Sequence, residues 1–317
     1  MRFSRYAWSV VAVNLFVILW GALVRATGSG AGCGRHWPLC NGEMLPRDPG
    51  LTTLIEFTHR ATSGIALLLV AILFWWSRRA LPPGHRARGA AAWSLVFISI
   101  EALIGAGLVL LELVGNDDSL GRAVYLAGHL LNTFLLLAAL ALTAHWSGAA
   151  GRTPEPRPRG GAVPWLLGFG LAGILVVGMT GAIAALGDTL FPARSLAEGL
   201  RADGDPAAHY LVRLRVLHPV LAILAGIYLS AMVWAVGRAR PAALESRWAR
   251  AVTLLVLLQL VVGLTNLFLL APTAVQLVHL LVADLLWIAS VVFAADAVSD
   301  GRFQDGRTVE DAGRLDG

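Results

Sequence analysis

The chain has 317 residues, of which 57% are hydrophobic and 14% charged, and its mean hydropathy is +0.69. A water-soluble globule of this composition would expose far too much apolar surface, so an ordinary soluble domain is excluded and an integral membrane protein is expected. The formal net charge of +5 comes from arginines that lie mostly between apolar stretches. It therefore gives no reason to expect nucleic acid as a partner.

Eight apolar stretches are long enough to cross a hydrocarbon core, which takes about 20 helical residues. In chain order they cover residues 7–26, 54–76, 90–111, 123–146, 163–186, 211–236, 248–270 and 274–297. The predicted fold class is an all-α integral membrane protein with eight transmembrane helices.

The arginines predict which loops face which side of the membrane. They cluster at the N-terminus and in every second connection, near residues 78–88, 152–159 and 238–250. By the positive-inside rule both termini are cytoplasmic. The outward loops are then those at residues 27–53, 112–122, 187–210 and 271–275.

The N-terminal apolar run also has to be compared with a cleaved signal. A lipoprotein signal ending at Cys33 is the alternative, because small residues precede that cysteine. The run is longer than the apolar region of a signal peptide, and Arg25 interrupts it. We therefore expect it to be the first membrane span.

The two halves of the chain resemble each other. "IEALIGAGLVLL" at 100–111 aligns with "LQLVVGLTNLFLL" at 258–270, and "AGHLLNTFLLLAAL" at 127–140 aligns with "LVHLLVADLLWIAS" at 277–290. Each half has four spans, so both enter the membrane in the same orientation, as a parallel repeat. The predicted organisation is an N-terminal half, a cytoplasmic linker, a C-terminal half and a disordered tail: residues 1–148, 149–162, 163–297 and 298–317.

Four of the eight histidines lie at one depth in the predicted helices. They are one to two turns below the outer ends of the even-numbered spans, two in each half: His59, His129, His218 and His279. A single membrane histidine more often bonds to a neighbouring helix than to a ligand. Four at one depth, paired by the repeat, favour two ligand sites.

Two imidazoles from facing helices of a bundle suit haem iron, which takes axial nitrogen ligands from opposite faces. Zinc is the rival metal, but it takes three or four protein ligands, and neither half offers a third histidine or a cysteine at this depth. Four arginines near the outer ends could pair with haem propionates, with interfacial snorkelling as the alternative: Arg25, Arg60, Arg213 and Arg215.

"GALVRATGSGAGCGRHWPLCNGEMLP" followed by "IEFTHRATSG", together with the later histidine segments, resembles the haem A synthase family over residues 7–297. The resemblance implies conversion of haem O to haem A, in which successive hydroxylations oxidise the C8 methyl of the ring to a formyl group. It implies a substrate haem at His59 and His129 and a haem b cofactor at His218 and His279. It further implies a bacterial plasma membrane location, with a haem O synthase and an electron donor as partners. The sequence leaves the oligomeric state open, with a homo-oligomer as one possibility.

Glu56 lies three residues before His59 and so on the same helical face, one turn further out. Its counterpart in the second half is Arg215. A carboxylate over one of two haems is expected if only that haem undergoes chemistry, so Glu56 is the predicted catalytic residue. A salt bridge to Arg60 or Arg25 is the alternative.

Cys33 and Cys40 lie in one predicted outer loop. A pair in an oxidising setting with no further cysteine favours a disulfide over a metal site, and the family carries such a pair in this loop. Some members have a second pair in the loop corresponding to 187–210. This chain has no cysteine there, so a mechanism that needs the second pair does not transfer.

Two questions stay open from the sequence. Glu101 and Asp284 are further acids within predicted spans, where either a structural hydrogen bond or proton transfer is possible. The four histidines also suit a di-haem electron-transfer cytochrome. A transporter fits the repeat, but its site would lie near the midplane rather than toward the outside.

Overall fold

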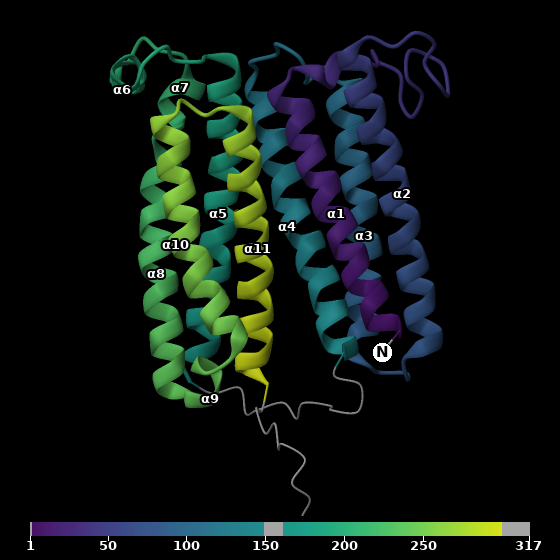
Figure 1. The fold of residues 1–317 in the computed structure, drawn as a ribbon, viewed down its shortest axis with the longest axis vertical. Coiled ribbons are helices and arrows are strands. Elements are labelled where there is room, and N and C mark those ends of the chain that lie inside the picture. The colour runs from purple at the N-terminus through teal and green to yellow at the C-terminus, as the bar shows by residue number, and fades with distance from the viewer. Residues whose placement is uncertain (1, 149–160, 300–317) are drawn as a thin grey trace, which may run out of the picture.

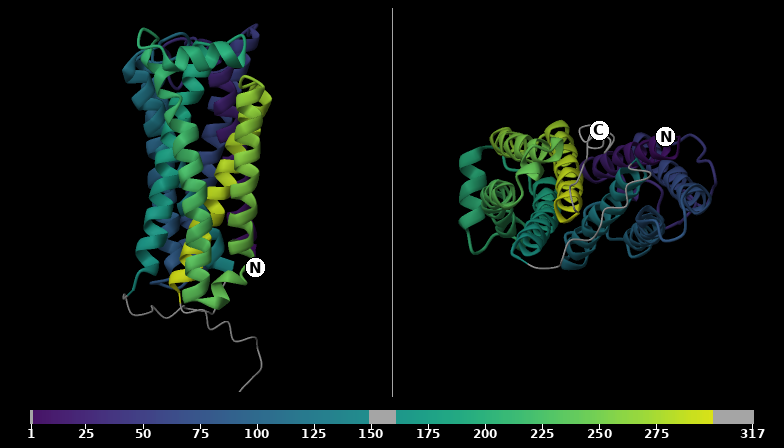
Figure 2. Two further views of the ribbon diagram at one scale, coloured as in Figure 1. Left: turned by 90° about the vertical axis from the view of Figure 1, so that its left-hand side faces the viewer. Right: turned by 90° about the horizontal axis from the view of Figure 1, so that it is seen from below.

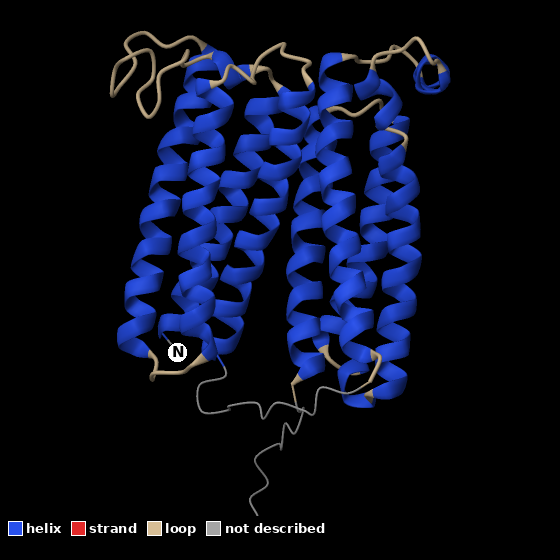
Figure 3. Ribbon diagram, turned by 180° about the vertical axis from the view of Figure 1, so that it is seen from behind, coloured by secondary structure: helices blue, strands red, loops and turns tan. Residues whose placement is uncertain are grey.

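A computed structural model describes residues 2–148 and 161–299, which form helices joined by short loops (Figure 3). Within these residues, eight helices are long and apolar enough to cross a membrane. This confirms the predicted all-helical class and its eight spans. The predicted linker and tail lie mostly outside the described residues.

The long helices stand side by side in two groups of four (Figure 1). The first group consists of α1 Arg2–Ala26, α2 Leu51–Ala80, α3 Arg86–Leu110 and α4 Leu120–Gly148. The second consists of α5 Val163–Leu190, α8 Leu217–Ala239, α10 Arg247–Phe268 and α11 Thr273–Val298. Four short helices occupy the connections: η1 Ser29–Ala31, α6 Leu196–Gly204, α7 Tyr210–Leu214 and α9 Pro241–Leu244.

The sixth predicted span, residues 211–236, is interrupted near its outer end. It begins as α7, breaks at Arg215 and Val216, and resumes as α8. Pro219 follows His218 in the first turn of α8 and has no N–H to donate to the carbonyl of Arg215, so a continuous helix would lack that bond. His218 therefore lies at the start of a helix, whereas His59 lies within the unbroken α2.

The two groups pack against each other through a shared apolar core. Phe134 of α4 and Trp287 of α11 stack with ring centres 5.4 Å apart and planes 15° apart. Both are almost fully buried, and the indole Nε1 of Trp287 donates to the carbonyl oxygen of Phe134. Seen from below, α11 lies against α1 and α4 (Figure 2). The interface is thus built around one aromatic pair.

Polar contacts join the two groups at both ends of this core. At one end, the guanidinium of Arg25 in α1 donates to Thr189 of α5 and to Gln276 of α11, each at 2.8 Å. At the other end, the imidazole of His145 in α4 lies 2.6 Å from Asp296 of α11. These bonds cross between the groups, so they oppose sliding or rotation of one group against the other.

The aromatic pair makes a testable contribution to stability. Trp287→Ala should lower the free energy of unfolding by about 3 to 5 kcal/mol, because it empties a fully packed site. Trp287→Phe keeps a ring for stacking but loses the indole hydrogen bond, which is worth about 1 kcal/mol. Trp165→Phe, at a side chain that is 73% exposed, is the matched control and should be neutral. Thermal unfolding in detergent would measure the series; equal midpoints for all variants would contradict this account.

Candidate functional site

His59 of α2 rests against the backbone of α1 at Gly21. A Cβ atom added at Gly21 would lie 2.9 Å from Cε1 of the ring, closer than two atoms can pack. The ring nitrogen Nδ1 is buried and has no hydrogen-bond partner. The ring is thus firmly seated while its polar atoms remain free for a ligand.

His129 of α4 is placed differently, beside a carboxylate of α3. Its Nδ1 lies 3.1 Å from Oε1 of Glu101, although the ring is not turned into hydrogen-bond geometry. The amide of Asn132 and the hydroxyl of Thr133 both donate to Glu101. The acid is therefore held in place by the helix that carries the histidine.

The second group brings His218 of α8 close to His279 of α11. Their ring centres are 6.1 Å apart and their planes stand at 89°. His218 rests on Gly181 of α5 as His59 does on Gly21, with a Cβ again 2.9 Å from the ring. Its Nδ1 lies 3.1 Å from the carbonyl oxygen of Val177, which orients the ring and leaves Nε2 for another bond.

His279 rests on Gly263 of α10, where an added Cβ would lie 3.0 Å from Cε1. Its Nε2 is 3.3 Å from the side-chain nitrogen of Gln259, and its Nδ1 is buried without a partner. The residue beside it along the sequence, Val278, is half-exposed. His279 itself is only partly exposed.

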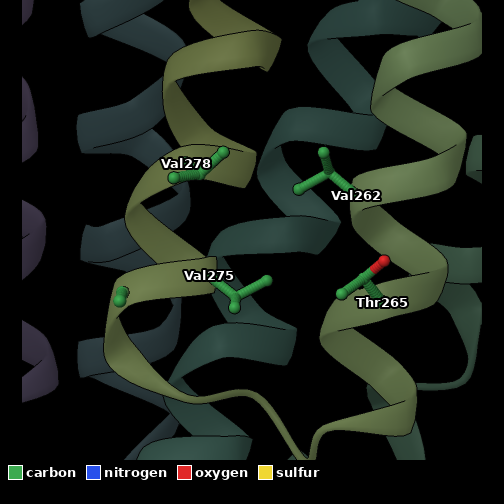
Figure 4. Close-up of a pocket in the computed structure, with 5 residues that line it drawn as sticks. Val262, Thr265, Val275 and Val278 are labelled. Carbon is green, nitrogen blue, oxygen red and sulfur yellow. The ribbon is translucent and has the colours of Figure 1, made fainter.

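An apolar groove of about 260 Å³ lies between α10 and α11 (Figure 4). It is lined by Val262, Thr265, Ala274, Val275 and Val278. Val275 lies one turn before His279 in α11, and Val262 is adjacent to Gly263 in α10. The lining is apolar apart from the hydroxyl of Thr265.

Glu56 is buried and both of its carboxylate oxygens have partners. Oε2 accepts the backbone N–H of Cys33 at 2.7 Å, and Oε1 accepts from the guanidinium of Arg60. Arg60 also donates to the backbone carbonyls of His36 and Leu39. The alternative of an ion pair with Arg60 is thus present in the structure. Glu56 and Arg60 together fasten the first loop to α2, one turn from His59.

Cys33 and Cys40 form a disulfide, as predicted. Both residues are buried, and the ring they close contains the carbonyls of His36 and Leu39 that Arg60 binds. The loop is therefore fixed twice, by a covalent bond and by Arg60, over the N-terminal part of α2.

The four arginines predicted to bind propionates have different surroundings. Arg25 bonds across the two groups of helices, and Arg60 bonds to the first loop. Arg215 lies within ion-pair distance of Asp188 and Asp203. Arg213 is exposed at the outer end of the second group. Three of the four guanidinium groups thus already bond within the protein, and a role with propionates stays a prediction.

Glu101 and Asp284, the two further acids within predicted spans, have different surroundings. Glu101 belongs to the His129 site. Asp284 of α11 is fully buried, and neither of its oxygens has a hydrogen-bond partner within the described chain. Both lie at depths that lipid or apolar side chains would otherwise fill.

The histidine pairs fit a metal that needs only two ligands from the protein, because its remaining ligands come from a cofactor ring. Among the described residues no three histidine, cysteine, aspartate or glutamate side chains gather in a way that could hold a metal ion, which disfavours a zinc site. The 6.1 Å between the rings of His218 and His279 suits two imidazoles on opposite sides of one metal, since such bonds are about 2 Å long. Haem iron has this requirement, and the buried unbonded nitrogens of the rings supply donors for it.

The glycines under the rings were not predicted, although a signal was present. "GALVRA" at 21–26 and "GAIAAL" at 181–186 stand at matching places in the first helix of each half. Glycine at a helix surface permits close approach of a neighbouring side chain. The histidine segments alone do not reveal these seats, because the glycines lie on different helices.

Fold and site together define a multi-pass helical membrane protein with two paired-histidine sites at one end of its bundle. The family model described as "Cytochrome oxidase assembly protein" (COX15-CtaA) matches residues 4–50 and 49–291. The "Heme A synthase" of Alkalihalophilus pseudofirmus is 30% identical over 284 residues, which cover 87% of this chain and 90% of that protein. The chain belongs to the haem A synthase family.

Two other relatives match in part. The "Heme A synthase" of Geobacillus kaustophilus is 43% identical over 104 residues, a third of each chain. A "Protoheme IX farnesyltransferase" of Thermus thermophilus is 49% identical over 301 residues, which cover 95% of this chain and 49% of that protein. This chain thus spans about half the length of the Thermus relatives it matches.

Substitution of the glycines tests the seating of the rings. Alanine normally stabilises a helix by about 1 kcal/mol relative to glycine, and Gly105→Ala should show this gain because nothing lies within 4 Å of its Cβ. Gly21→Ala and Gly181→Ala should instead lower the unfolding temperature, because their methyl groups displace His59 and His218. Thermal unfolding of the three variants in one detergent would compare them. Equal stabilisation in all three would show that the rings are not seated on these glycines.

Proposed function

We propose that this protein is a haem A synthase, which oxidises the C8 methyl of haem O to a formyl group by successive hydroxylations. The observation that carries the proposal is that each group of helices brings two histidines to its site. Nδ1 of His59, His129 and His279 is buried without a partner, and the ring centre of His218 lies 6.1 Å from that of His279. Membership of the family supports the same reading. The assignment of each pair to a substrate or a cofactor is part of the proposal.

The first group, with His59 and His129, is proposed to hold the substrate haem. Glu56 supports this choice, because an acid lies next to the histidine of α2 in this group, whereas Arg215 has the corresponding place before His218. The carboxylate can accept up to about four hydrogen bonds, and two are described here. Glu56 therefore retains acceptor capacity toward a ligand while Arg60 and the loop hold its position.

The second group, with His218 and His279, is proposed to hold haem b, which supplies electron transfer when bound. The carbonyl of Val177 fixes the tautomer and orientation of His218, as such second partners of ligating histidines do. Gly181 and Gly263 let both rings lie against neighbouring helices. The residues of this group hold a ligand but bring no carboxylate to it, which suits a cofactor that is not itself altered.

The parallel repeat and the membrane orientation are also proposed. In support of the repeat, His59 rests on the first helix of one group as His218 rests on the first helix of the other. In support of cytoplasmic termini, the N-terminus lies at the same end of the bundle as the α2–α3 connection and α9 (Figure 1), where arginines gather. A bacterial plasma membrane, an electron donor, a haem O synthase and self-association complete the proposal.

The name of the Thermus relatives points to prenyl transfer, a different reaction. Those proteins are about twice the length of the part that matches this chain, so the name does not say which half transfers a prenyl group. The Alkalihalophilus protein is covered almost end to end. Oxidation of haem is therefore the activity that the relatives support for this chain.

Co-expression tests the proposal and separates it from a di-haem cytochrome. The protein would be produced with a haem O synthase in a host that lacks haem A, and the extracted pigments analysed by mass. Haem A is expected with the unchanged protein. His218→Ala and His279→Ala should lose the retained haem b, whereas His59→Ala and His129→Ala should stop product formation but keep that haem. Two bound haems with no haem A in any sample would favour electron transfer alone.

Glu56 variants test the proposed catalytic role against the purely structural one. Glu56→Gln keeps the size and most of the hydrogen bonding but loses the charge, so haem A formation should fall at least tenfold while the retained haem b is unchanged. Glu56→Ala should also loosen the first loop, which limited proteolysis would detect. Normal haem A formation by the Gln variant would leave Glu56 only the role of anchoring Arg60 and Cys33.

A further inference from the structure

The two histidine sites differ in the side chain that faces the histidine of the last helix in each group. In the first group this is the carboxylate of Glu101, 3.1 Å from a ring nitrogen of His129. In the second group it is the neutral amide of Gln259, 3.3 Å from a ring nitrogen of His279. The sequence alignment of the halves places Glu101 and Gln259 at equivalent positions, although Glu101 approaches Nδ1 of His129 and Gln259 approaches Nε2 of His279. A charged side chain in one group thus corresponds to a neutral one in the other.

The donors that hold the acid are also confined to the first group. The amide of Asn132 donates to Glu101 and to the carbonyl of Phe97. The hydroxyl of Thr133 lies within hydrogen-bond distance of Glu101 and of the carbonyl of His129, and its single proton can serve either acceptor. In the aligned segment of α11 the corresponding residues are Val282 and Ala283. Neither of these side chains can donate a hydrogen bond. Carboxylate and donors thus form a set that the second group lacks completely.

The position of Glu101 is suited to act on His129 rather than on solvent. The side chain is 20% exposed, and both of its oxygens accept a hydrogen bond from α4, the helix that carries His129. One of them, Oε1, is also the oxygen nearest the ring. The acid is therefore fixed relative to the histidine by the same helix.

Gln259 is the neutral counterpart of Glu101, and it lies beside His279. Its side-chain oxygen has no hydrogen-bond partner, and Nδ1 of His279 has none either. Rotation of the amide would bring an acceptor to the ring, so Gln259 can orient His279 as Glu101 can orient His129. The two sites differ in the seat of the ring as well as in charge, and exchanging Glu101 and Gln259 tests the charge.

A negative charge beside an axial imidazole stabilises the more positive, oxidised state of a metal that the imidazole binds. Groups in contact with ligating histidines set both ring orientation and the properties of the metal, and for haem such contacts are a main means of setting the reduction potential. The effect is strong where water is excluded, because the effective dielectric constant is low.

From this asymmetry we infer that Glu101 is a positioning residue that orients His129 and makes a haem bound in the first group harder to reduce than one bound in the second. This rests on the proposed binding of haem by the two histidine pairs. Glu101 would thus favour oxidised iron at the first site. This effect is independent of Glu56, which lies on α2 and faces Arg60 and the first loop.

The test is a reciprocal exchange followed by potentiometric titration of the purified, haem-loaded protein. His129→Ala and His279→Ala first show which of the two redox components belongs to which site. Glu101→Gln should then move the first-site component to a higher potential, and Gln259→Glu should move the second-site component to a lower one. The expected size is about tenfold in the reduction equilibrium constant, which is about 59 mV for one electron.

Thr133→Val is the matched control. It removes one hydrogen bond to Glu101 without removing the charge, so it should lower thermal stability while the first-site potential moves much less than in Glu101→Gln. A merely structural role for Glu101 predicts the reverse: loss of stability in Glu101→Gln with no change of potential. That result, with haem bound at both sites, would overturn the inference.

Two other outcomes can be distinguished from a failure of the inference itself. If Glu101→Gln does not fold, Gln259→Glu decides alone, and an unchanged second-site potential would count against the inference. If the unchanged protein binds no haem at either site, the proposed function fails first. Retained haem with potentials that do not respond to either exchange leaves the proposed function standing and removes only the role given to Glu101.

Discussion

The whole arrangement depends on close contact between helices at a few glycines. Three of the four histidine rings rest on the backbone of a neighbouring helix, at Gly21, Gly181 and Gly263. A lipid-embedded helix gains little from apolar contact alone, so small residues and close packing largely decide which faces meet. These contacts fix the rings while leaving nitrogens unbonded. The fold thereby holds histidine rings whose buried nitrogens have no hydrogen-bond partner within the described residues and can bind a ligand.

His129 is the exception, and its surroundings show how one fold can provide two different sites. Nothing lies within 4 Å of a Cβ at Gly105, the residue aligned with Gly263. A carboxylate positions the ring instead of a glycine seat. A second acid, Glu56, ties the first loop to α2 beside His59. In the first group a carboxylate thus accompanies each histidine, whereas the histidines of the second group face a backbone carbonyl and an amide. This difference is the chemical basis for proposing a reacting haem in one group and a resident haem in the other.

The two groups are held together by contacts that do not touch either histidine pair. Phe134 and Trp287 stack in the shared core, while Arg25 and His145 bond across its two ends. An arginine within the hydrocarbon region is tolerable only where such partners are available. Arg25 was expected near a propionate, and its three bonds to the second group give it a structural task that also holds the outer ends of the two sites in register.

Hydropathy was sufficient for the eight spans, because apolar length depends on local sequence alone. The common depth of His59, His129, His218 and His279 stays a prediction. The disulfide followed from having two cysteines in one loop. The partners of Arg25, Arg60 and Arg215, the break before His218 and the acid beside His129 needed the tertiary structure. A long side chain can reach several neighbouring helices, and periodicity along one helix does not say which helix will face it. Only packing brought Glu101 of α3 to His129 of α4, and with it the difference between the two sites.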